Sequence, residues 1–371
     1  MENAISSIIC VADMNITGAL DQALADLALP EVYVQRAKQI SLLDKQGFLG
    51  LRPVTKLEES RALIYRMHVP SVYEEGVMRR IAEATDLSMG GRGCIFSQHI
   101  NRYRGTPPSF DTEKLDRMCG RMNKLVSEEH ALISCTVPRD SGDSLAQAIL
   151  ELGIGVPVVF FGIGAGLRDK LGLMRITIPV EKEIIWFIVS RSDADLVEKT
   201  LIPRARLDVP GNGFLYRFFV HAPVVNLRIR HGKRFHAATM EQVIAALDEV
   251  RGSSDWRRFG SRKHDPGEKG NVNSRGLFFI GEEEEVDIFR HTAIQCGARG
   301  ATFNSLEMRS YSAFTREEAM ESHSRQLCDI ITSHEVEEKL RSSLAQTGLF
   351  AEGKSCVLKT FNVELPSIIR H

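Results

Sequence analysis

The sequence lacks any Cys-x-x-Cys pair, although it contains seven cysteines. The seven are odd in number and scattered, and some lie inside apolar runs, as Cys10 and Cys135 do. A disulfide framework or a zinc site needs an even or closely spaced set. The pattern instead predicts small buried thiols in a reducing compartment, which favours a cytoplasmic location. No metal site is predicted, because the histidines also lack ligand spacing with cysteine or acid.

Long apolar runs are missing as well. No stretch approaches the ~20 residues that a membrane-spanning helix needs, and the longest, residues 156–163 and 183–190, are the length of strands. The first residues carry no basic segment ahead of an apolar one, so we expect no signal peptide. The 47 basic and 48 acidic residues give a net charge of -1 at pH 7. Membrane insertion and nucleic-acid binding are therefore not expected.

One order of elements occurs three times along the chain. Each copy opens with an apolar strand, expected at residues 5–12, 131–137 and 276–280. Apolar residues three and four apart then predict a helix over residues 17–27, 141–152 and 286–296. Second strands are expected at residues 32–43, 156–161 and 301–308. Polar loops (44–60, 168–182 and 312–325) separate them from third strands at residues 62–69, 184–189 and 327–332.

A second helix and a fourth strand complete each copy. The second helices are expected at residues 73–85, 194–204 and 336–346. The resulting order, βαββαβ, is that of a ferredoxin-like unit, in which two helices cover one face of a four-stranded antiparallel sheet. We therefore predict an α+β fold of three tandem ferredoxin-like repeats.

The boundaries of these repeats follow from the connectors. A Pro-Pro break precedes a short helix expected at residues 113–126, and a Gly- and Ser-rich stretch at residues 252–273 reads as a flexible linker after a helix at residues 239–250. The predicted division is a first unit at 1–105, a linker helix at 106–129, a second unit at 130–235, a helix and linker at 236–273, and a third unit at 274–371.

The turn before the fourth strand contains glycine in all three units. Glycines let backbone N–H groups approach an oxyanion, and a lysine adds charge. In the first unit this turn spans residues 89–96. The positions of interest in the other two turns are Gly211, Asn212, Gly213, Thr347, Gly348, Glu352, Gly353 and Lys354. These turns resemble the B-loop of the PII nitrogen-regulatory family, in which Thr-Gly and then Gly-Asp-Gly-Lys precede the last strand of the core.

Two arginines follow the fourth strand of the second unit, in the segment Val-Asn-Leu-Arg-Ile-Arg. Arg228 and Arg230 alternate along an extended segment, which places both guanidinium groups on one face, as phosphate binding requires. The segment resembles the C-loop of PII proteins, whose arginines reach phosphates in the cleft of a neighbouring subunit. The first unit keeps a weaker trace at Arg102 and Arg104, and the third has almost none.

A third similarity lies at the end of the second strand of the second unit. Gly162 and Gly164 resemble the glycines at the base of the PII T-loop. Gly166 stands where the family has the glutamine that helps to hold Mg²⁺ and 2-oxoglutarate, so neither is predicted here. A dinucleotide fingerprint of the Gly-x-Gly-x-x-Gly type would need a long helix to follow, and the residues after this stretch are too few before the next strand.

The resemblance implies both an assembly and a function. PII proteins are homotrimers with nucleotide clefts between subunits, so three fused units imply a monomeric, single-chain pseudotrimer. We expect a regulator that binds ATP or ADP in clefts between units and controls an unidentified partner protein through loop conformation. Arg228 and Arg230 could supply the arginines that the turn of the third unit needs from a neighbour, but which units face each other depends on their order in the ring, which the sequence does not give. No nucleophile or acid–base set indicates an enzyme.

Each of these features also has a purely structural interpretation. The glycines then form a loop base without a ligand, the turn that contains Thr347 is a plain helix cap, and the arginines are solvated charges. On that interpretation the chain is a non-catalytic pseudotrimer for protein interaction, whose ligand clefts have decayed.

Overall fold

The computed structural model describes most of the chain. The described residues are 4–45, 54–105, 108–121, 129–166, 180–209, 212–232, 274–312, 322–351 and 354–365. The helix expected at residues 239–250 and the linker after it lie outside this part. None of the helices in these ranges is both long and apolar enough to cross a membrane.

The fold combines helices and strands in an order that recurs along the chain. The first unit consists of β1 (Ile5–Asp13), η1 (Met14–Ile16), α1 (Thr17–Asp26), β2 (Val32–Lys45), β3 (Val54–Pro70), η3 (Ser71–Tyr73), α2 (Glu74–Ala84) and β4 (Gly93–Gln98). After it come β5 (Arg102–Arg104) and α3 (Thr112–Cys119). The second unit consists of β6 (His130–Pro138), α4 (Gly142–Leu152), β7 (Val158–Gly166), β8 (Val180–Ser190), α5 (Ala194–Arg204) and β9 (Phe214–Val224), followed by β10 (Arg230–Gly232). The third unit consists of β11 (Ser274–Gly281), α7 (Glu283–Cys296), β12 (Gly300–Arg309), β13 (Ser322–Ser333), α8 (His334–Leu344) and β14 (Val357–Val363).

Within each unit the strands lie in the same spatial order. The first unit has the order β2-β3-β1-β4, the second β7-β8-β6-β9, and the third β12-β13-β11-β14. Neighbouring strands inside a unit are antiparallel. In each case the second strand occupies one edge and the fourth strand the other, which is the order of a ferredoxin-like sheet.

The second strands of the three units pair with one another in a cycle. The start of β2 pairs with the end of β12, through Val34 and Glu307. The start of β12 in turn pairs with the end of β7, through Phe303 and Ile163. The start of β7 pairs with the later part of β2, where Val159 lies opposite Lys38. Each second strand therefore uses its beginning for one neighbour and its end for the other, as in a closed heterologous assembly.

The fourth strands form a second cycle. β4 pairs with the end of β9, and Arg217 in β9 exchanges backbone hydrogen bonds with Glu364, which follows β14. β14 pairs with β5, the extension of the first unit, where Lys359 lies opposite Tyr103. Together with the β2–β12 pairing, nine of the described strands close into a ring in the order β2-β3-β1-β4-β9-β6-β8-β7-β12.

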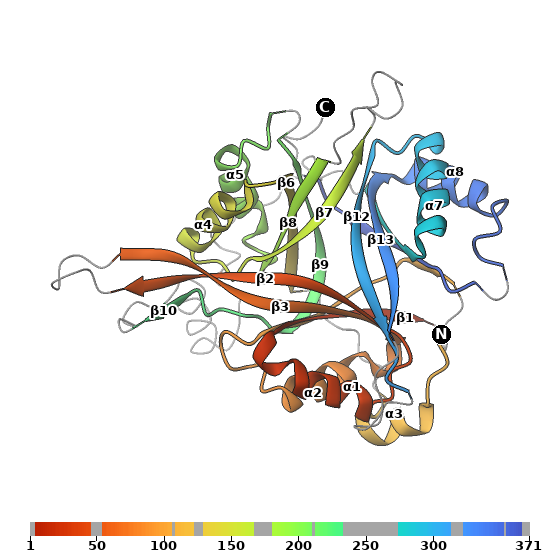
Figure 1. The fold of residues 1–371 in the computed structure, drawn as a ribbon, viewed down its shortest axis with the longest axis horizontal. Helices are drawn as coiled ribbons and strands as arrows, with labels where there is room; N and C mark the ends of the chain where they lie inside the picture. The colour runs from red at the N-terminus through yellow and green to blue at the C-terminus, as the bar shows by residue number, and fades with distance from the viewer. Residues whose placement is uncertain are drawn as a thin grey trace.

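The ring separates an inner core from three outer ones. Along β1, Ile9 and Val11 point into the centre, whereas Ile8 and Cys10 pack beneath helices, as the period of two along a strand requires. The helix pairs α1/α2, α4/α5 and α7/α8 lie outside the sheet, at three separate positions around the strands (Figure 1). All three units contribute buried side chains to the centre, so the inner core exists only when the ring is closed.

A glycine is required where the chain enters the fourth strand. Gly93 and Gly213 have φ values of +135° and +133°. A Cβ at Gly93 would lie 1.9 Å from the carbonyl oxygen of Val11, and one at Gly213 would lie 2.1 Å from that of Thr136. At both positions the turn passes directly against the end of the first strand, a close approach that only glycine permits.

Several details differ from the expectations. The helix expected at residues 113–126 ends at Cys119, where Gly120 follows with a φ of +68°. The polar loop expected at residues 44–60 is shorter, because β2 and β3 continue as a long hairpin to the pair Lys45 and Val54. Ile40 in β2 packs into the outer core of the second unit, which stabilises the extension. Likewise, β8 and β13 begin a few residues before the expected strands. Helix α7 begins three residues early, because Glu282 and Glu285 form a capping box.

Candidate functional site

The turn of the third unit ends helix α8 in an ordinary way. The hydroxyl of Thr347 donates to the carbonyl oxygen of Leu344 at 3.0 Å, and Gly348 has a φ of +73°. Lys354 Nζ lies 3.5 Å from a carboxylate oxygen of Glu285. Glu352 and Gly353 lie outside the described residues. The turn therefore has a capping role, and the predicted nucleotide contacts of Thr347, Gly348 and Lys354 stay predictions.

Among the described residues, the arginine segment of the second unit lies against the turn of the first unit. Arg228 Nη1 donates to the carbonyl oxygen of Gly90 at 3.2 Å. The backbone N–H of Gly91 donates to Asn226 Oδ1 at 3.0 Å. The sequence left the direction of the cycle open, and the contacts of Arg228 place its segment against the first unit. Of Arg230 only the backbone, in β10, is described.

The glycines of the second unit have structural roles. Gly162 and Gly164 lie in β7, not in a loop, and β7 pairs with β12 at this point. A Cβ at Gly162 would lie 2.9 Å from both Asn304 Oδ1 and the carbonyl oxygen of Phe303. Close approach of two strands therefore explains this glycine.

The described part of the second turn is closed by a contact within the chain. Asn212 Nδ2 donates to the carbonyl oxygen of Arg206 at 3.2 Å, which closes the turn after α5. Gly213 has the backbone role given above, and Gly211 lies outside the described residues. No contact here decides between a nucleotide-binding turn and a plain one.

A pocket of about 310 Å³ lies between the first and third units. Its wall from the first unit is β5, and its walls from the third unit are α8, β11 and β14. The lining residues are Arg102, Tyr103, Arg104, Leu277, Glu337, Leu340, Arg341, Leu344, Leu358 and Thr360. The sequence predicted that Arg102 and Arg104 are a weak counterpart of the arginine segment, because two arginines alternate there before a glycine. Arg341 was missed, because on a helix it reads as an ordinary solvated residue.

Ion pairs connect the two units at the rim of this pocket. Glu338 accepts hydrogen bonds from Arg102 Nη1 at 2.6 Å and from Arg341 Nη2 at 2.6 Å. The hydrogen bond from Arg102, followed by that from Arg341, lowers the pKa of Glu338. The guanidinium carbon of Arg104 lies 4.2 Å from the ring centre of Phe350, which belongs to the turn of the third unit. The pocket thus adjoins that turn, and an arginine from the neighbouring unit contacts it.

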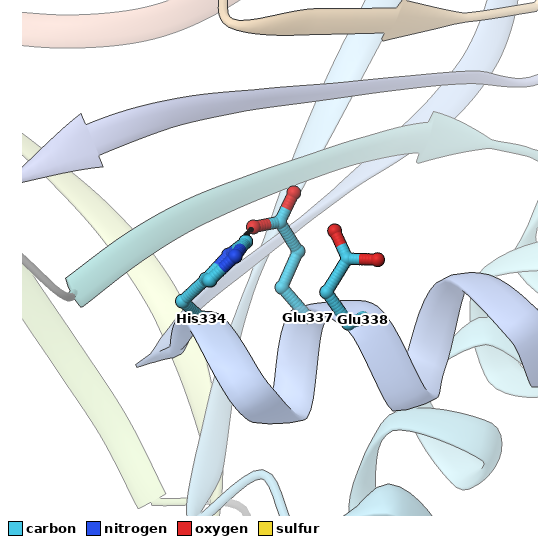
Figure 2. A group of neighbouring side chains, drawn as sticks. All are labelled: His334, Glu337 and Glu338. Carbon is cyan, nitrogen blue, oxygen red and sulfur yellow. Dashed lines mark hydrogen bonds and ion pairs between the residues drawn. The ribbon is translucent and has the colours of Figure 1, made fainter.

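Three potential metal ligands lie together at the start of α8. His334, Glu337 and Glu338 point to the same side of the helix (Figure 2), with their ligand atoms within 4.8 Å of one another. Arginines already neutralise both acids, since Arg275 Nε lies 3.3 Å from Glu337 and Arg102 binds Glu338. We therefore assign no metal to this group.

The composition of the pocket suits an amphipathic anion. Leucines line it, among them Leu277, Leu340 and Leu358, and so do three arginines. A volume of about 310 Å³ is at the lower end of the ~300–1,000 Å³ typical of small-molecule sites. A flat apolar group on the leucines and an anionic group at the arginines would satisfy both parts.

No family model matches the chain, and no curated protein matches it. Two solved structures show a distant likeness. The B. subtilis GlnK–ATP complex is 14% identical, with a TM-score of 0.22, and the match covers 28% of this chain and 88% of that chain. A second structure of B. subtilis GlnK is 13% identical, with a TM-score of 0.22, covering 29% of this chain and 95% of that one. A likeness at this level supports no conclusion about function.

Proposed function

We propose that the chain is a single-chain pseudotrimer of PII-like units, which binds an adenine nucleotide in the pocket between its first and third units. One observation carries the proposal. The cyclic pairing of the fourth strands brings the arginine segment that follows one unit, with Arg102 and Arg104, against the pocket and turn of another. Binding there would control a partner protein through the loops that join second and third strands.

The two cycles of strand pairing support the pseudotrimer. Each unit offers the beginning of its second strand to one neighbour and its end to the other. The fourth strands repeat the scheme, from β4 to β9, from Arg217 to Glu364, and from β14 to β5. A homotrimer uses one heterologous interface three times, and this chain would use three diverged versions of it.

Glu338 suggests how binding would be coupled to structure. This carboxylate bridges Arg102 of the first unit and Arg341 of the third. A phosphate group can also offer two oxygens to a guanidinium and carries more charge, so it would replace the carboxylate at both guanidinium groups. The released glutamate would move away from the phosphate because of like-charge repulsion. A nucleotide would in this way change the contact between two units and shift the population of their loops.

We also propose that the chain has no catalytic activity. A serine–lysine pair does occur, since Lys359 Nζ donates to Ser7 Oγ at 2.8 Å. The exposed fractions of Ser7 and Lys359 are 0% and 1%, so a substrate has no access to the hydroxyl. The pair therefore supports a structural role.

Calorimetry of the full chain with ATP, ADP and AMP tests the proposal. Arg102→Ala removes a charge-assisted hydrogen bond and is expected to weaken binding about tenfold. Glu338→Gln removes the competing carboxylate charge and is expected to strengthen binding. Glu335→Gln is the matched control, because Glu335 lies on the same helix and pairs with Lys339 at 2.7 Å, outside the pocket lining. Equal affinities for all four proteins would contradict the assignment of the site.

The alternative function is a structural pseudotrimer that binds proteins only. The bridge from Glu338 to Arg102 and Arg341 favours it, since this carboxylate would compete with an anion for both guanidinium groups. A ligand that binds only the folded protein raises its melting temperature. If none of the three nucleotides at millimolar concentration changes the melting temperature, the alternative stands and the nucleotide pocket is refuted.

A further inference from the structure

The centre of the ring contains charged residues contributed by different units. In each unit one row of residues crosses the fourth, first and third strands and faces inward. The three rows are Phe96–Ile9–Arg66, Tyr216–Ser134–Trp186 and Lys359–Phe278–Asp329. The third strands thus bring an arginine, a tryptophan and an aspartate into the same central core.

Arg66 is buried without a hydrogen-bond partner. Its exposed fraction is 1%, and within the described part of the chain Nε, Nη1 and Nη2 all lack an acceptor. The guanidinium carbon lies 5.1 Å from the ring centre of Trp186 and 6.0 Å from that of Phe160. Aromatic faces attract the cation but accept none of its five N–H bonds. A buried charge in this state is costly unless something else satisfies it.

The nearest carboxylate does not complete the site. Asp329 Oδ2 accepts a hydrogen bond from the hydroxyl of Tyr216 at 2.8 Å. Its Oδ1 is shielded from water and has no partner among the described residues, although the residue as a whole is only half-buried. Arg66 forms no ion pair with it. Burial raises the pKa of Asp329 to about 7, which makes it a poor permanent counter-ion.

The surroundings of Arg66 are rich in donors. Lys359 Nζ lies in the same interior, bonded to Ser7 Oγ and to Gln98 Oε1 at 3.2 Å. Gln98 Nε2 and His68 Nε2 have no partner in the described ranges. Burial lowers the pKa of His68 to about 3, so the ring is neutral, and Lys359 contributes to that shift. Two basic residues thus face one acid, and the unused groups are mostly nitrogens.

We propose that a small monovalent anion of one to four heavy atoms, such as a halide, nitrate or bicarbonate, binds in the centre of the ring at the guanidinium of Arg66. Such an anion accepts the unused N–H groups of Arg66 and neutralises the excess of basic residues. The forked guanidinium suits an oxyanion in particular, because it binds two oxygens at once. The site is independent of the nucleotide pocket.

Crystals of the full chain grown in sodium bromide test this directly. The expected result is an anomalous bromide peak within hydrogen-bond distance of the Arg66 nitrogens. Water alone at this position, or a direct contact between Arg66 and Asp329, would overturn the proposal.

A solution measurement extends the test. The melting temperature is compared in sodium bromide and in sodium gluconate at equal ionic strength. Above the dissociation constant it should rise by about 2 °C for each tenfold increase in bromide. Arg66→Met should lose this response, whereas Arg121→Met, at an exposed arginine paired with Asp116, should keep it. An unchanged response in Arg66→Met would refute the site, and if that variant does not fold the crystallographic result decides alone.

Discussion

Replacement of Arg217 by methionine should destabilise the closed ring in a pH-dependent way. Arg217 lies in β9 with a side chain that is 12% exposed. Its Nη2 lies 2.7 Å from Glu364, which follows β14 of the third unit. Its Nη1 lies 3.3 Å from Glu198 and also contacts Asp195. Arg217→Met leaves three carboxylates together without their cation. Removal of one partner from a buried ion pair costs about 3 kcal/mol.

The pH dependence follows from Glu198. Burial raises the pKa of Glu198 from 4.5 to about 7, and Arg217 opposes this rise. Because the folded protein binds more protons than the unfolded chain between pH 4.5 and 7, stability falls as the pH rises through that window. Loss of Arg217 raises the pKa of Glu198 further. The variant should therefore lose more stability at pH 8.5 than at pH 5.5, where Glu198 is protonated.

Urea unfolding at these two pH values measures the effect. The control is Arg121→Met, because Arg121 is an exposed arginine that binds Asp116 through two hydrogen bonds. Exposed ion pairs contribute little to stability, so this variant should remain close to the unmodified protein at both pH values. A loss below about 1 kcal/mol in Arg217→Met, or the same loss at both pH values, would refute this account of the contact between the second and third units.

Three further predictions address the turn, the centre and the pocket. Gly213→Ala should lower the free energy of unfolding by at least about 2 kcal/mol, because its Cβ would lie 2.1 Å from a carbonyl oxygen. The control is Gly18→Ala, at a position in open space on α1, which should cause no loss of stability. Urea denaturation measures both variants. Burial lowers the pKa of Lys359 from 10.5 to about 7, so the unfolded chain binds more protons in that range and stability should rise with pH across it. Lys359→Met should flatten that rise in unfolding curves recorded at several pH values, and an unchanged slope would exclude this lysine as its source. Arg104→Ala should weaken nucleotide binding, as calorimetry can show. The variant also removes the cation that contacts the ring of Phe350, so the proton chemical shifts of that ring should change. Constant chemical shifts would contradict this contact.

The local elements could be predicted because each depends on its own residues. The apolar runs of the first strands and the three–four spacing in the helices correspond to elements of the structure, with small changes at the ends. Two of the moved boundaries have an identified cause, one tertiary and one local. Ile40 extends β2 because it packs against another unit, and Glu285 moves the start of α7 because it completes a capping box.

The contacts between units could not be predicted in the same way. Nothing in the sequence around Arg228 says that it meets Gly90 and not the third turn, since that depends on the direction of the cycle. Arg66 stands between Tyr65 and Met67 in a strand, where a charge normally marks the solvent side. Its inward position follows only from closure of the ring, which turns one face of every sheet toward a common centre.

A crystal structure of the full chain grown with ADP tests the central claim most directly. The account predicts nucleotide density between β5, β14 and α8, with phosphate oxygens at Arg102 and Arg341 and with Glu338 displaced from both. An unaltered Glu338 bridge, with the pocket empty and ADP absent or bound elsewhere, would contradict it.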